Sequence, residues 1–393
     1  MKSLLNIAWT IAIAFVAATA LVYSETARMP EVPQVELLRT PVGGIQPQTV
    51  VDSRGVLHMI YFTGDAAAGN IEYVRRAPGA DAFSKPIRVN SQPGSALAVG
   101  TVRGPQMAVG QDGRVYVVWF GSSKATPKGP EGSTPLLFSR LDASGSAFTP
   151  QRNLVRYAKG LDGGLSVAAD QKGDVYVVWH ATGKIPGEAN RRVYLARSTN
   201  SGRTFSREVP VSPAALGACG CCGMRAFVDR RGALFVLYRA AAENIHRNMT
   251  LLVSADHGRT FRSEEVSSWQ LNACPMSTDY LTEGGRHVLA AWEKAGEVYF
   301  DRINPATFQL SSAFAAPGQS NDRKHPAVAA NSRGDVLLAW TEGTGWKQGG
   351  SLAWQLFSKA GQPLGAVGHA PGVPVWDMPS VYTDPNGSFT IVY

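Results

Sequence analysis

The chain of 393 residues has few charged residues and only four cysteines. Charged residues make up 17%, and no window after the N-terminus combines sustained helical periodicity with capping residues. Glycine (41) and proline (24) are plentiful instead, which is typical of many short strands joined by tight turns. We therefore expect an all-β fold rather than a helical one.

The sequence also lacks a Lys/Arg tract interleaved with aromatic residues, which argues against nucleic acid as a partner. The net charge is nevertheless +8, and the computed isoelectric point is near 9.3. A basic surface favours anionic partners such as acidic glycans or lipid head groups. We expect an anionic glycan or another small ligand, and surface charge that only aids solubility is the alternative.

Residues 1–24 differ from the rest of the chain. Lys2 precedes an apolar run from Leu4 to Tyr23, and Ala-Thr-Ala at 18–20 has the small-x-small pattern of a cleavage site. This pattern predicts a signal peptide, and an uncleaved N-terminal anchor is the alternative because roughly 20 apolar residues span a bilayer. No cysteine follows the run, which excludes a bacterial lipid anchor. We expect export to the periplasm or the medium, with membrane contact only through an uncleaved N-terminal segment.

Residues 31–393 contain seven copies of a strand, a polar turn with glycine and a second strand. Two examples are "PQMAVGQDGRVYVVWF" from Pro105 and "LSVAADQKGDVYVVWH" from Leu165, and most copies end in Trp or Tyr. Two further strand-like runs separate consecutive copies, so each unit has four short antiparallel strands. The turn glycines are Gly55, Gly113, Gly173, Gly232, Gly285, Gly334 and Gly387.

Such repeated four-stranded units predict a β-propeller, because a closed ring of sheets buries faces that one sheet leaves exposed. The count favours seven blades, and six blades with an extra hairpin are the alternative. The chain ends directly after the seventh strand pair. The segment "PQVELLRT" before Pro41 is a candidate outer strand that would complete the last blade and close the ring.

Two turns between third and fourth strands carry a recognisable motif. "SADHGRTF", from Ser254 to Phe261, matches S-x-D-x-G-x-T-F, and "STNSGRTF", from Ser198 to Phe205, matches with Asn in the Asp place. The chain thereby resembles the sialidases and related BNR-repeat propellers, whose Asp-box this is, over nearly all of its length after residue 40. The resemblance implies that the box residues cap and pack the turns. They are Ser198, Asn200, Gly202, Phe205, Ser254, Asp256, Gly258 and Phe261.

The resemblance also implies an exo-α-sialidase-like glycoside hydrolase in which arginines clamp a carboxylate. The family's Arg-Ile-Pro before the first strand is replaced by Ile45-Gln46-Pro47. Guanidinium groups bind carboxylates bidentately, so other arginines are candidates for the clamp. The substrate-binding candidates are Arg103, Arg225, Arg239, Arg323, His180 and His325. Residues of the right type for the catalytic Asp and the Tyr–Glu pair are Tyr238, Asp279 and Glu293, although none aligns with the family's positions.

Three cysteines, Cys219, Cys221 and Cys222, lie in "ACGCCGMRAFVD", and Cys274 lies in "NACPMST". The C-x-C-C and C-P pair resembles a subgroup of exported sialidase-like propellers. Both segments lead into a first strand, which places all four thiols at one axial mouth, in two adjacent blades. A disulfide would join the blades, whereas four soft thiolates would suit Cu(I) or tetrahedral Zn. A C-x-x-C redox dithiol is the third interpretation, but a strand follows it instead of a helix.

These observations predict an exported sialidase-superfamily propeller that binds or cleaves an anionic glycan at the axial mouth, where propeller pockets usually form. Two alternatives stay open. One is a non-catalytic propeller that binds a ligand or a protein partner, and the other is a periplasmic protein that binds Cu or Zn through its thiolates.

Overall fold

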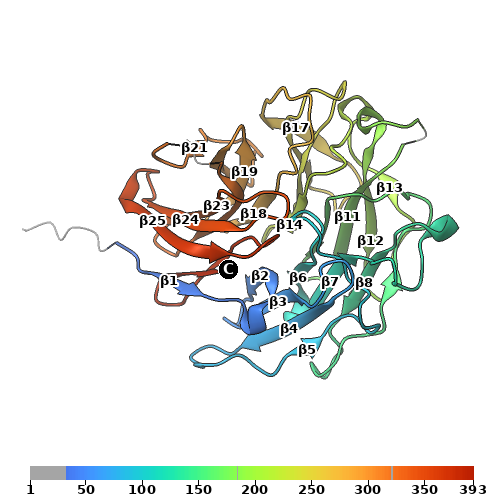
Figure 1. The fold of residues 1–393 in the computed structure, drawn as a ribbon, viewed down its shortest axis with the longest axis horizontal. Helices are drawn as coiled ribbons and strands as arrows, with labels where there is room; N and C mark the ends of the chain where they lie inside the picture. Colours follow the sequence, from blue (N-terminus) through green and yellow to red (C-terminus); the bar gives the residue numbers. More distant parts are fainter. Residues whose placement is uncertain (1–31, 184, 320–321) are drawn as a thin grey trace, which may run out of the picture. The chain divides into compact units, whose positions relative to one another are not determined.

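Seven small sheets surround a common axis in the computed structural model, which describes residues 32–183, 185–319 and 322–393 (Figure 1). The predicted signal peptide or anchor at 1–24 lies outside the described residues. Residues 33–393 form one compact unit, within the predicted boundaries of the propeller. No helix in the described part of the chain is long and apolar enough to cross a membrane.

Six blades have four antiparallel strands in chain order, as the repeats predict. Blade 1 contains β2 (Ile45–Val51), β3 (Leu57–Thr63), β4 (Asn70–Arg76) and β5 (Ile87–Arg88). Blade 2 contains β6 (Gln106–Val109), β7 (Val115–Phe120), β8 (Leu136–Arg140) and β9 (Arg152–Asn153). Blade 3 contains β10 (Leu165–Ala169), β11 (Val175–Ala181), β12 (Arg192–Ser198) and β13 (Val209–Pro210).

The next three blades repeat this order. Blade 4 contains β14 (Met224–Val228), β15 (Leu234–Arg239), β16 (Met249–Ser254) and β17 (Arg262–Ser267). Blade 5 contains β18 (Asp279–Gly284), β19 (His287–Lys294), β20 (Glu297–Ile303) and β21 (Phe314–Ala315). Blade 6 contains β22 (Lys324–Ala330), β23 (Val336–Glu342), β24 (Gly350–Phe357) and β25 (Pro363–Val373).

The seventh blade closes the ring with both ends of the propeller. It contains β26 (Ser380–Thr383), β27 (Phe389–Val392) and β1 (Val35–Leu38), and β1 pairs in parallel with β27. The outer strand predicted before Pro41 is therefore confirmed, and the blade count is seven. This blade differs from the other six because it has three strands among the described residues, one of them parallel.

Hydrophobic packing between blades holds the ring together. Each inner strand contacts the next one, and β26 contacts β2, so seven junctions close the circle. In the described residues each junction contains its own buried apolar cluster. The recurring tryptophans that end the second strands are fully buried in these clusters; they are Trp119, Trp179, Trp292 and Trp340. Their repetition reflects packing, which supplies most of the stability of such a ring.

The hairpin turns explain the recurring glycines. All seven predicted turn glycines have φ between 67° and 92°, a left-handed conformation that a Cβ atom disfavours. Five short 3₁₀ turns complete the described secondary structure. They are η1 (Pro41–Gly43), η2 (Gln111–Gly113), η3 (Pro130–Gly132), η4 (Glu188–Asn190) and η5 (Ala214–Leu216).

The two Asp-box sequences form matching turns after β12 and β16. Ser254 Oγ accepts from the N–H of Gly258 at 2.8 Å, and Asp256 Oδ1 accepts from the N–H of Thr260 at 2.9 Å. Ser198 and Asn200 make the equivalent contacts with Gly202 and Thr204, both at 2.9 Å. Phe205 packs edge-on against Phe138, and Phe261 packs on the cluster between blades 3 and 4. These residues stabilise the outer turns, away from the axis.

Candidate functional site

One end of the propeller, here called the mouth, is where the inner strands begin. Several described residues other than glycine have a left-handed backbone there, among them Gln46, Met276, His325 and Trp376, with φ of 54°, 49°, 54° and 62°. Such conformations cost about 1–3 kcal/mol each and cluster at functional sites. The four residues named come from four different blades.

Loops from non-adjacent blades meet at the mouth. A Cβ atom on Gly100, in blade 2, would lie 3.2 Å from Cζ3 of Trp346 in blade 6 and 3.4 Å from Cε of Met276 in blade 5. Trp346 is 54% exposed and packs edge-on against Trp376 at 5.8 Å. The Gln46 side chain donates to the carbonyl groups of Ala98 and Trp376 at 3.0 and 2.8 Å. These contacts across the ring cover the mouth end of the axis.

An axial cavity of about 670 Å³ runs along the inner strands of all seven blades. Gln48, Arg225 and Tyr280 line its inner part, and the hairpin turns at the other end of the strands form its rim. This volume falls in the range of pockets for small ligands, about 300–1,000 Å³. Lys172, Arg230 and Arg231 are exposed on the rim, and it also carries the carboxyl groups of Asp52, Asp170, Asp229 and Glu283. None of the mouth residues named above lines this cavity, so it opens at the opposite end of the propeller and not at the mouth where the sequence predicts the binding site.

One register position explains which side chains reach the axis. Each second strand ends near a Trp or Tyr, and the residue before that aromatic pairs with one residue of the inner strand. In blade 3, for example, Val178 precedes Trp179 and pairs with Ser166. The inner-strand residue of this pair defines the position in every blade. In blades 1, 3 and 7 this residue accepts from a backbone N–H of the next blade. The acceptors are Gln48, Ser166 and Ser380, at 3.1, 2.9 and 3.0 Å. These three side chains therefore serve ring closure.

Blades 2, 4 and 5 use the same position differently. There it holds Gln106, Arg225 and Tyr280, which we call the axial cluster. Arg225 donates through one terminal nitrogen to Gln106 Oε1 at 2.5 Å, and its guanidinium lies 4.7 Å from the ring centre of Tyr280. The intervening blade 3 carries the small Ser166, which leaves room for this contact. The side chains of the axial cluster contact one another. Among the described residues they do not accept from a backbone N–H of the next blade, so they differ from the three residues that serve ring closure.

Arg225 has an incomplete set of partners. Its Nε is buried without a hydrogen-bond acceptor, and no ion pair in the described part of the chain includes it. Burial lowers the pKa of Arg225, and the nearby Tyr280 and Asp279 counteract that shift. A guanidinium has such a high pKa that it stays charged. The cavity therefore contains a cation that lacks a counter-ion in contact.

Asp279 lies beside this cluster, at the start of β18. It is 6% exposed, and its Oδ1 has no hydrogen-bond partner. Burial raises the pKa of Asp279 to about 8, although the positive charge of Arg225 opposes the shift. The carboxyl group is therefore mainly protonated at neutral pH and can donate a hydrogen bond. Asp279 does not line the cavity directly, since Tyr280 occupies the facing position.

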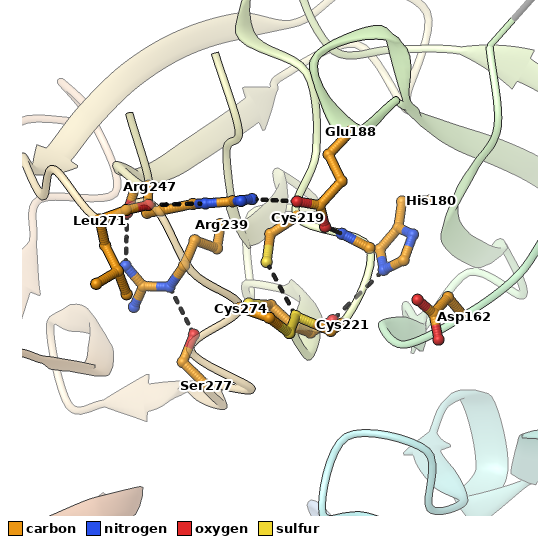
Figure 2. Close-up of a disulfide and its surroundings, with 12 residues drawn as sticks. Asp162, His180, Glu188, Cys219, Cys221, Arg239, Arg247, Leu271, Cys274 and Ser277 are labelled. Carbon is orange, nitrogen blue, oxygen red and sulfur yellow. Dashed lines mark hydrogen bonds and ion pairs between the residues drawn. A yellow bond between two sulfur atoms is a disulfide. The ribbon is translucent and has the colours of Figure 1, made fainter. Parts of the chain in front are cut away.

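Arg239, another predicted clamp residue, is buried and fully engaged. It donates to Ser277 Oγ and to the carbonyl groups of Arg247 and Glu293, at 2.5, 2.7 and 2.6 Å. Its guanidinium also stacks on Trp269 at 4.9 Å. Figure 2 shows Arg239 with its contact to Ser277. These contacts join blades 4 and 5, so Arg239 stabilises their junction.

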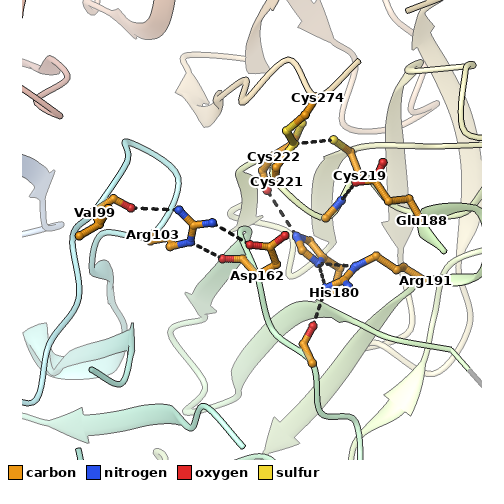
Figure 3. Close-up of polar contacts among 12 residues, drawn as sticks. Val99, Arg103, Asp162, His180, Glu188, Arg191, Cys219, Cys221, Cys222 and Cys274 are labelled. Atoms are coloured by element: carbon orange, nitrogen blue, oxygen red, sulfur yellow. Dashed lines mark hydrogen bonds and ion pairs between the residues drawn. A yellow bond between two sulfur atoms is a disulfide. The ribbon is translucent and has the colours of Figure 1, made fainter. Parts of the chain in front are cut away.

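Arg323 and Arg103 also use their guanidinium groups within the protein. Arg323 contacts Glu297 and Glu342 at 3.1 and 3.4 Å and donates to three carbonyl groups. Arg103 forms an ion pair with Asp162 at 2.7 Å and donates to Val99 O at 3.1 Å at the mouth (Figure 3). Of the four predicted clamp arginines, Arg225 thus retains the most unused donor capacity.

The two predicted histidines are buried and held by neighbouring groups. His180 Nε2 faces the carbonyl oxygen of Cys222 at 3.4 Å, and its Nδ1 accepts from Arg191 at 3.1 Å. Burial and Arg191 lower the pKa of His180 well below its usual value. His325 Nδ1 bonds Thr341 Oγ1 at 2.8 Å, and burial lowers the pKa of His325 to about 3. Both rings are therefore neutral at physiological pH.

The remaining catalytic candidates lie apart from the cavity. Tyr238 is 1% exposed in the apolar cluster between blades 3 and 4, and burial raises its pKa. Glu293 Oε2 accepts from the N–H of His325 at 2.9 Å, and burial raises the pKa of Glu293 to about 7. The structure does not bring Tyr238 and Glu293 together with Arg225 in the cavity lining.

The four cysteines meet at the junction of blades 4 and 5. A disulfide joins Cys221 to Cys274, as the bridging interpretation predicts, and Cys219 and Cys222 are free and buried (Figure 2). The Sγ atoms of Cys219 and Cys221 are 3.5 Å apart. Contact with Cys222 and burial raise the pKa of Cys219. Although burial opposes it, the hydrogen bond from Cys219 lowers the pKa of Cys222.

Sequence reasoning missed Gln106 and Tyr280 as site residues. A signal for Gln106 was present, because Pro-Gln recurs at the same place in blades 1 and 2, at 47–48 and 105–106. Tyr280 directly follows the candidate Asp279, but aromatic residues are common in strands, so the sequence does not distinguish it. Asp377 was also missed. Burial raises its pKa to about 7, and its Oδ1 accepts from the N–H of Gln46 at 2.6 Å.

The fold and the cavity define a seven-bladed β-propeller with an axial chamber of ligand size. No protein-family model matches the chain, and no curated protein matches it. Among solved structures, a protein of unknown function from Dyadobacter fermentans is 13% identical with a TM-score of 0.52, covering 87% of this chain and 98% of that one.

Two glycan-acting proteins are similar to the same degree. The leech intramolecular trans-sialidase, solved with 2,7-anhydro-Neu5Ac, is 9% identical with a TM-score of 0.51 over 85% of this chain and 79% of that one. The Penicillium chrysogenum α-L-arabinanase, solved with arabinobiose, is 13% identical with a TM-score of 0.51 over 84% and 98%. At these identities the likeness concerns the fold, and the chain has a sialidase-like propeller fold.

Proposed function

We propose that this protein is an exported propeller that binds an acidic saccharide in its axial cavity, with the carboxylate of the ligand on Arg225. The observation that carries the proposal is the state of Arg225: it lines a cavity of about 670 Å³, its Nε has no acceptor and no carboxylate contacts it among the described residues. A carboxylate would supply both the missing acceptor and the missing charge.

The surroundings of Arg225 support a sugar rather than a bare anion. Tyr280 and Gln48 line the same inner part of the cavity and offer an aromatic face and an amide. Pockets for small ligands combine such apolar and aromatic surfaces with a few polar groups that fix orientation. The net charge of +8 would attract an anionic ligand from solution.

Cleavage of the same saccharide is a second candidate function, and it is favoured by Asp279. A pKa raised to about 8 keeps this carboxyl protonated at neutral pH. Glycoside hydrolysis requires a protonated acid at the leaving oxygen and a second carboxylate or another nucleophile. Asp279 would fill the first role only if the ligand reaches past Tyr280.

The test is a binding and turnover assay on the full exported chain. Sialyllactose, a galacturonic acid disaccharide and the neutral control lactose are each titrated by calorimetry, and NMR spectra of the same mixtures report new reducing ends. We expect at least one acidic saccharide to bind and lactose not to bind. Equal binding of acidic and neutral sugars, or no binding of either acidic sugar, would contradict the proposal. New reducing ends would add cleavage to it.

A matched pair of variants locates the site. Arg225→Met should weaken binding at least tenfold, because a charge-assisted hydrogen bond contributes about 1.5–3 kcal/mol. Arg262→Met is the control, since Arg262 lies on the outer strand β17 and is 63% exposed. Equal loss in both variants would place the saccharide elsewhere.

A further inference from the structure

The four sulfur atoms form one compact group at the junction of blades 4 and 5. The Sγ atoms of Cys219, Cys221 and Cys222 all lie within 4.8 Å of one another, and Cys274 is bonded to Cys221. A single bridge between the blades needs only two of them. The presence of two further buried thiols at the same place therefore requires a separate explanation.

The spacing of these sulfurs suits a tetrahedral thiolate site. Zinc–sulfur bonds of about 2.3 Å place the sulfurs of a tetrahedron about 3.8 Å apart. The observed Cys219–Cys221 separation is 3.5 Å, close to that edge length. Reduction would break the bond that holds Cys221 and Cys274 together, and both sulfurs would then be free to act as ligands.

The backbone around the group is fixed from both blades. The N–H of Cys219 donates to Arg239 O at 2.9 Å, and the N–H of Gly223 donates to Ser277 O at 2.8 Å. The sulfur positions therefore do not depend on the disulfide alone. Preorganised ligands of this kind reduce the cost of ordering a metal site.

The surroundings also suit a negatively charged thiolate complex that can be reached from solvent. Figure 2 shows Arg239 and Arg247 beside the cysteines, and both guanidinium groups are buried. Arg247 is paired with Glu188 at 2.6 Å, whereas Arg239 has no carboxylate among its hydrogen-bond acceptors. Cys274 is exposed, in contrast to Cys219 and Cys222, and gives access to the group.

From this geometry we infer a redox-controlled metal site: when the Cys221–Cys274 bridge is reduced, Cys219, Cys221, Cys222 and Cys274 bind one soft d¹⁰ cation, Zn²⁺ or Cu⁺. A dithiol reductant supplies two electrons and two protons to the bridge and becomes a cyclic disulfide itself. The four thiols then release four protons as the cation binds, which gives a complex of charge −2 with Zn²⁺ or −3 with Cu⁺. Thiolate ligands and tetrahedral geometry select these cations over Mg²⁺ or Ca²⁺. The inference does not depend on saccharide binding.

The test compares oxidised and reduced protein. The full chain is treated with dithiothreitol under nitrogen and freed of reductant, and its thiols are counted. It is then incubated with one equivalent of Zn²⁺ or Cu⁺ and passed through a desalting column for elemental analysis. We expect two thiols and no retained metal before reduction, and four thiols and one retained ion afterwards. Co²⁺ in place of Zn²⁺ should give the absorption of a tetrahedral thiolate complex.

Variants separate ligands from neighbours. Cys219→Ser and Cys222→Ser each leave the bridge intact and should lower the affinity of the reduced protein for Zn²⁺ at least tenfold. Met276→Leu is the control, because Met276 packs against the cysteines and offers no thiolate. Reduced protein that retains neither metal would overturn the inference. So would serine variants that bind Zn²⁺ like the wild type, or a thiol count that stays at two in dithiothreitol.

Discussion

Arg225 and Arg239 lie on adjacent strands of blade 4, yet their environments are opposite. Arg239 donates to three acceptors and stacks on Trp269, and its partners lie in blade 5 or in the segments just before β16 and just after β17. Arg225 donates to one neutral amide, and its Nε has no acceptor. Both residues are arginines of the same blade, so residue type and position do not distinguish them. The difference is the number of N–H donors that have no acceptor within the described residues. An arginine with unused donors is available to a ligand, whereas one without them stabilises the contact between blades.

The largest expected effect is on stability, at Arg239. Arg239→Met leaves three acceptors between blades 4 and 5 without a donor and should lower the free energy of unfolding by about 4 kcal/mol. Arg225→Met should change it by less than about 1 kcal/mol, because it removes one hydrogen bond and one unsatisfied donor. Urea unfolding followed by tryptophan fluorescence measures both. Equal losses would mean that the two arginines have the same role.

The disulfide gives the next effect at the same junction. Replacing Cys221 and Cys274 by Ser opens a loop of 53 residues and should lower the unfolding free energy by about 3 kcal/mol. Saccharide binding should stay unchanged, because neither Cys221 nor Cys274 lines the axial cavity. Urea unfolding and calorimetry on the double variant test the two statements. A loss of binding without a loss of stability would show that the junction and the cavity are not separate regions.

Asp279 predicts a pH dependence. Its folded pKa of about 8 lies above the ordinary value of 3.8, so between these values the folded state keeps a proton that the unfolded state has lost. Stability conferred by this proton is complete below pH 4 and falls by about 1.4 kcal/mol per pH unit as the pH rises toward 8. Asp279→Asn should remove that slope.

The measurement for Asp279 is the difference in unfolding free energy between wild type and Asp279→Asn at pH 5, 6 and 7. Glu293, Asp377, His180 and His325 titrate in both proteins, so the difference isolates Asp279. A difference that does not change with pH would show that this carboxyl is ionised in the folded protein, and it would remove the support for an acid role.

The smallest expected effect is on ligand binding, at Gln106, whose amide oxygen accepts from Arg225 and orients its guanidinium. Gln106→Leu removes the only side-chain acceptor that Arg225 has among the described residues. It should weaken the binding of an acidic saccharide about fivefold, corresponding to about 1 kcal/mol. Unfolding free energy should change by less than about 1 kcal/mol. Calorimetry with the best acidic ligand measures this. Tighter binding in Gln106→Leu would show that Gln106 competes with the ligand instead of orienting Arg225.

The sequence predicts the fold well because the fold depends on repeated local signals. The seven turn glycines all have the left-handed conformation, and the segment before Pro41 forms the closing strand. The cysteine-rich segment also meets Cys274 as predicted, since both segments lead into first strands of adjacent blades. The spacing of the repeats and the order of the strands along the chain are enough to predict each of these features. No side-chain contact has to be known.

The sequence predicts the site less well. Whether a side chain is available to a ligand depends on its contacts with residues that are distant in the sequence. Arg239 and Arg323 have the residue type of a carboxylate clamp, but carbonyl groups and neighbouring side chains already occupy their donors. Tyr238 ends a second strand, as Trp119 does, and is buried for the same reason. The special role of Gln106 arises from the small Ser166 in the blade between it and Arg225, which no motif encodes.

The most direct test of the central statement, that Arg225 is the ligand-binding cation of the axial cavity, is a calorimetric titration of one acidic saccharide into wild type, Arg225→Met and Arg262→Met. We expect Kd to rise at least tenfold in Arg225→Met and to be unchanged in Arg262→Met. An acidic saccharide that binds wild type and Arg225→Met with the same Kd would contradict the account.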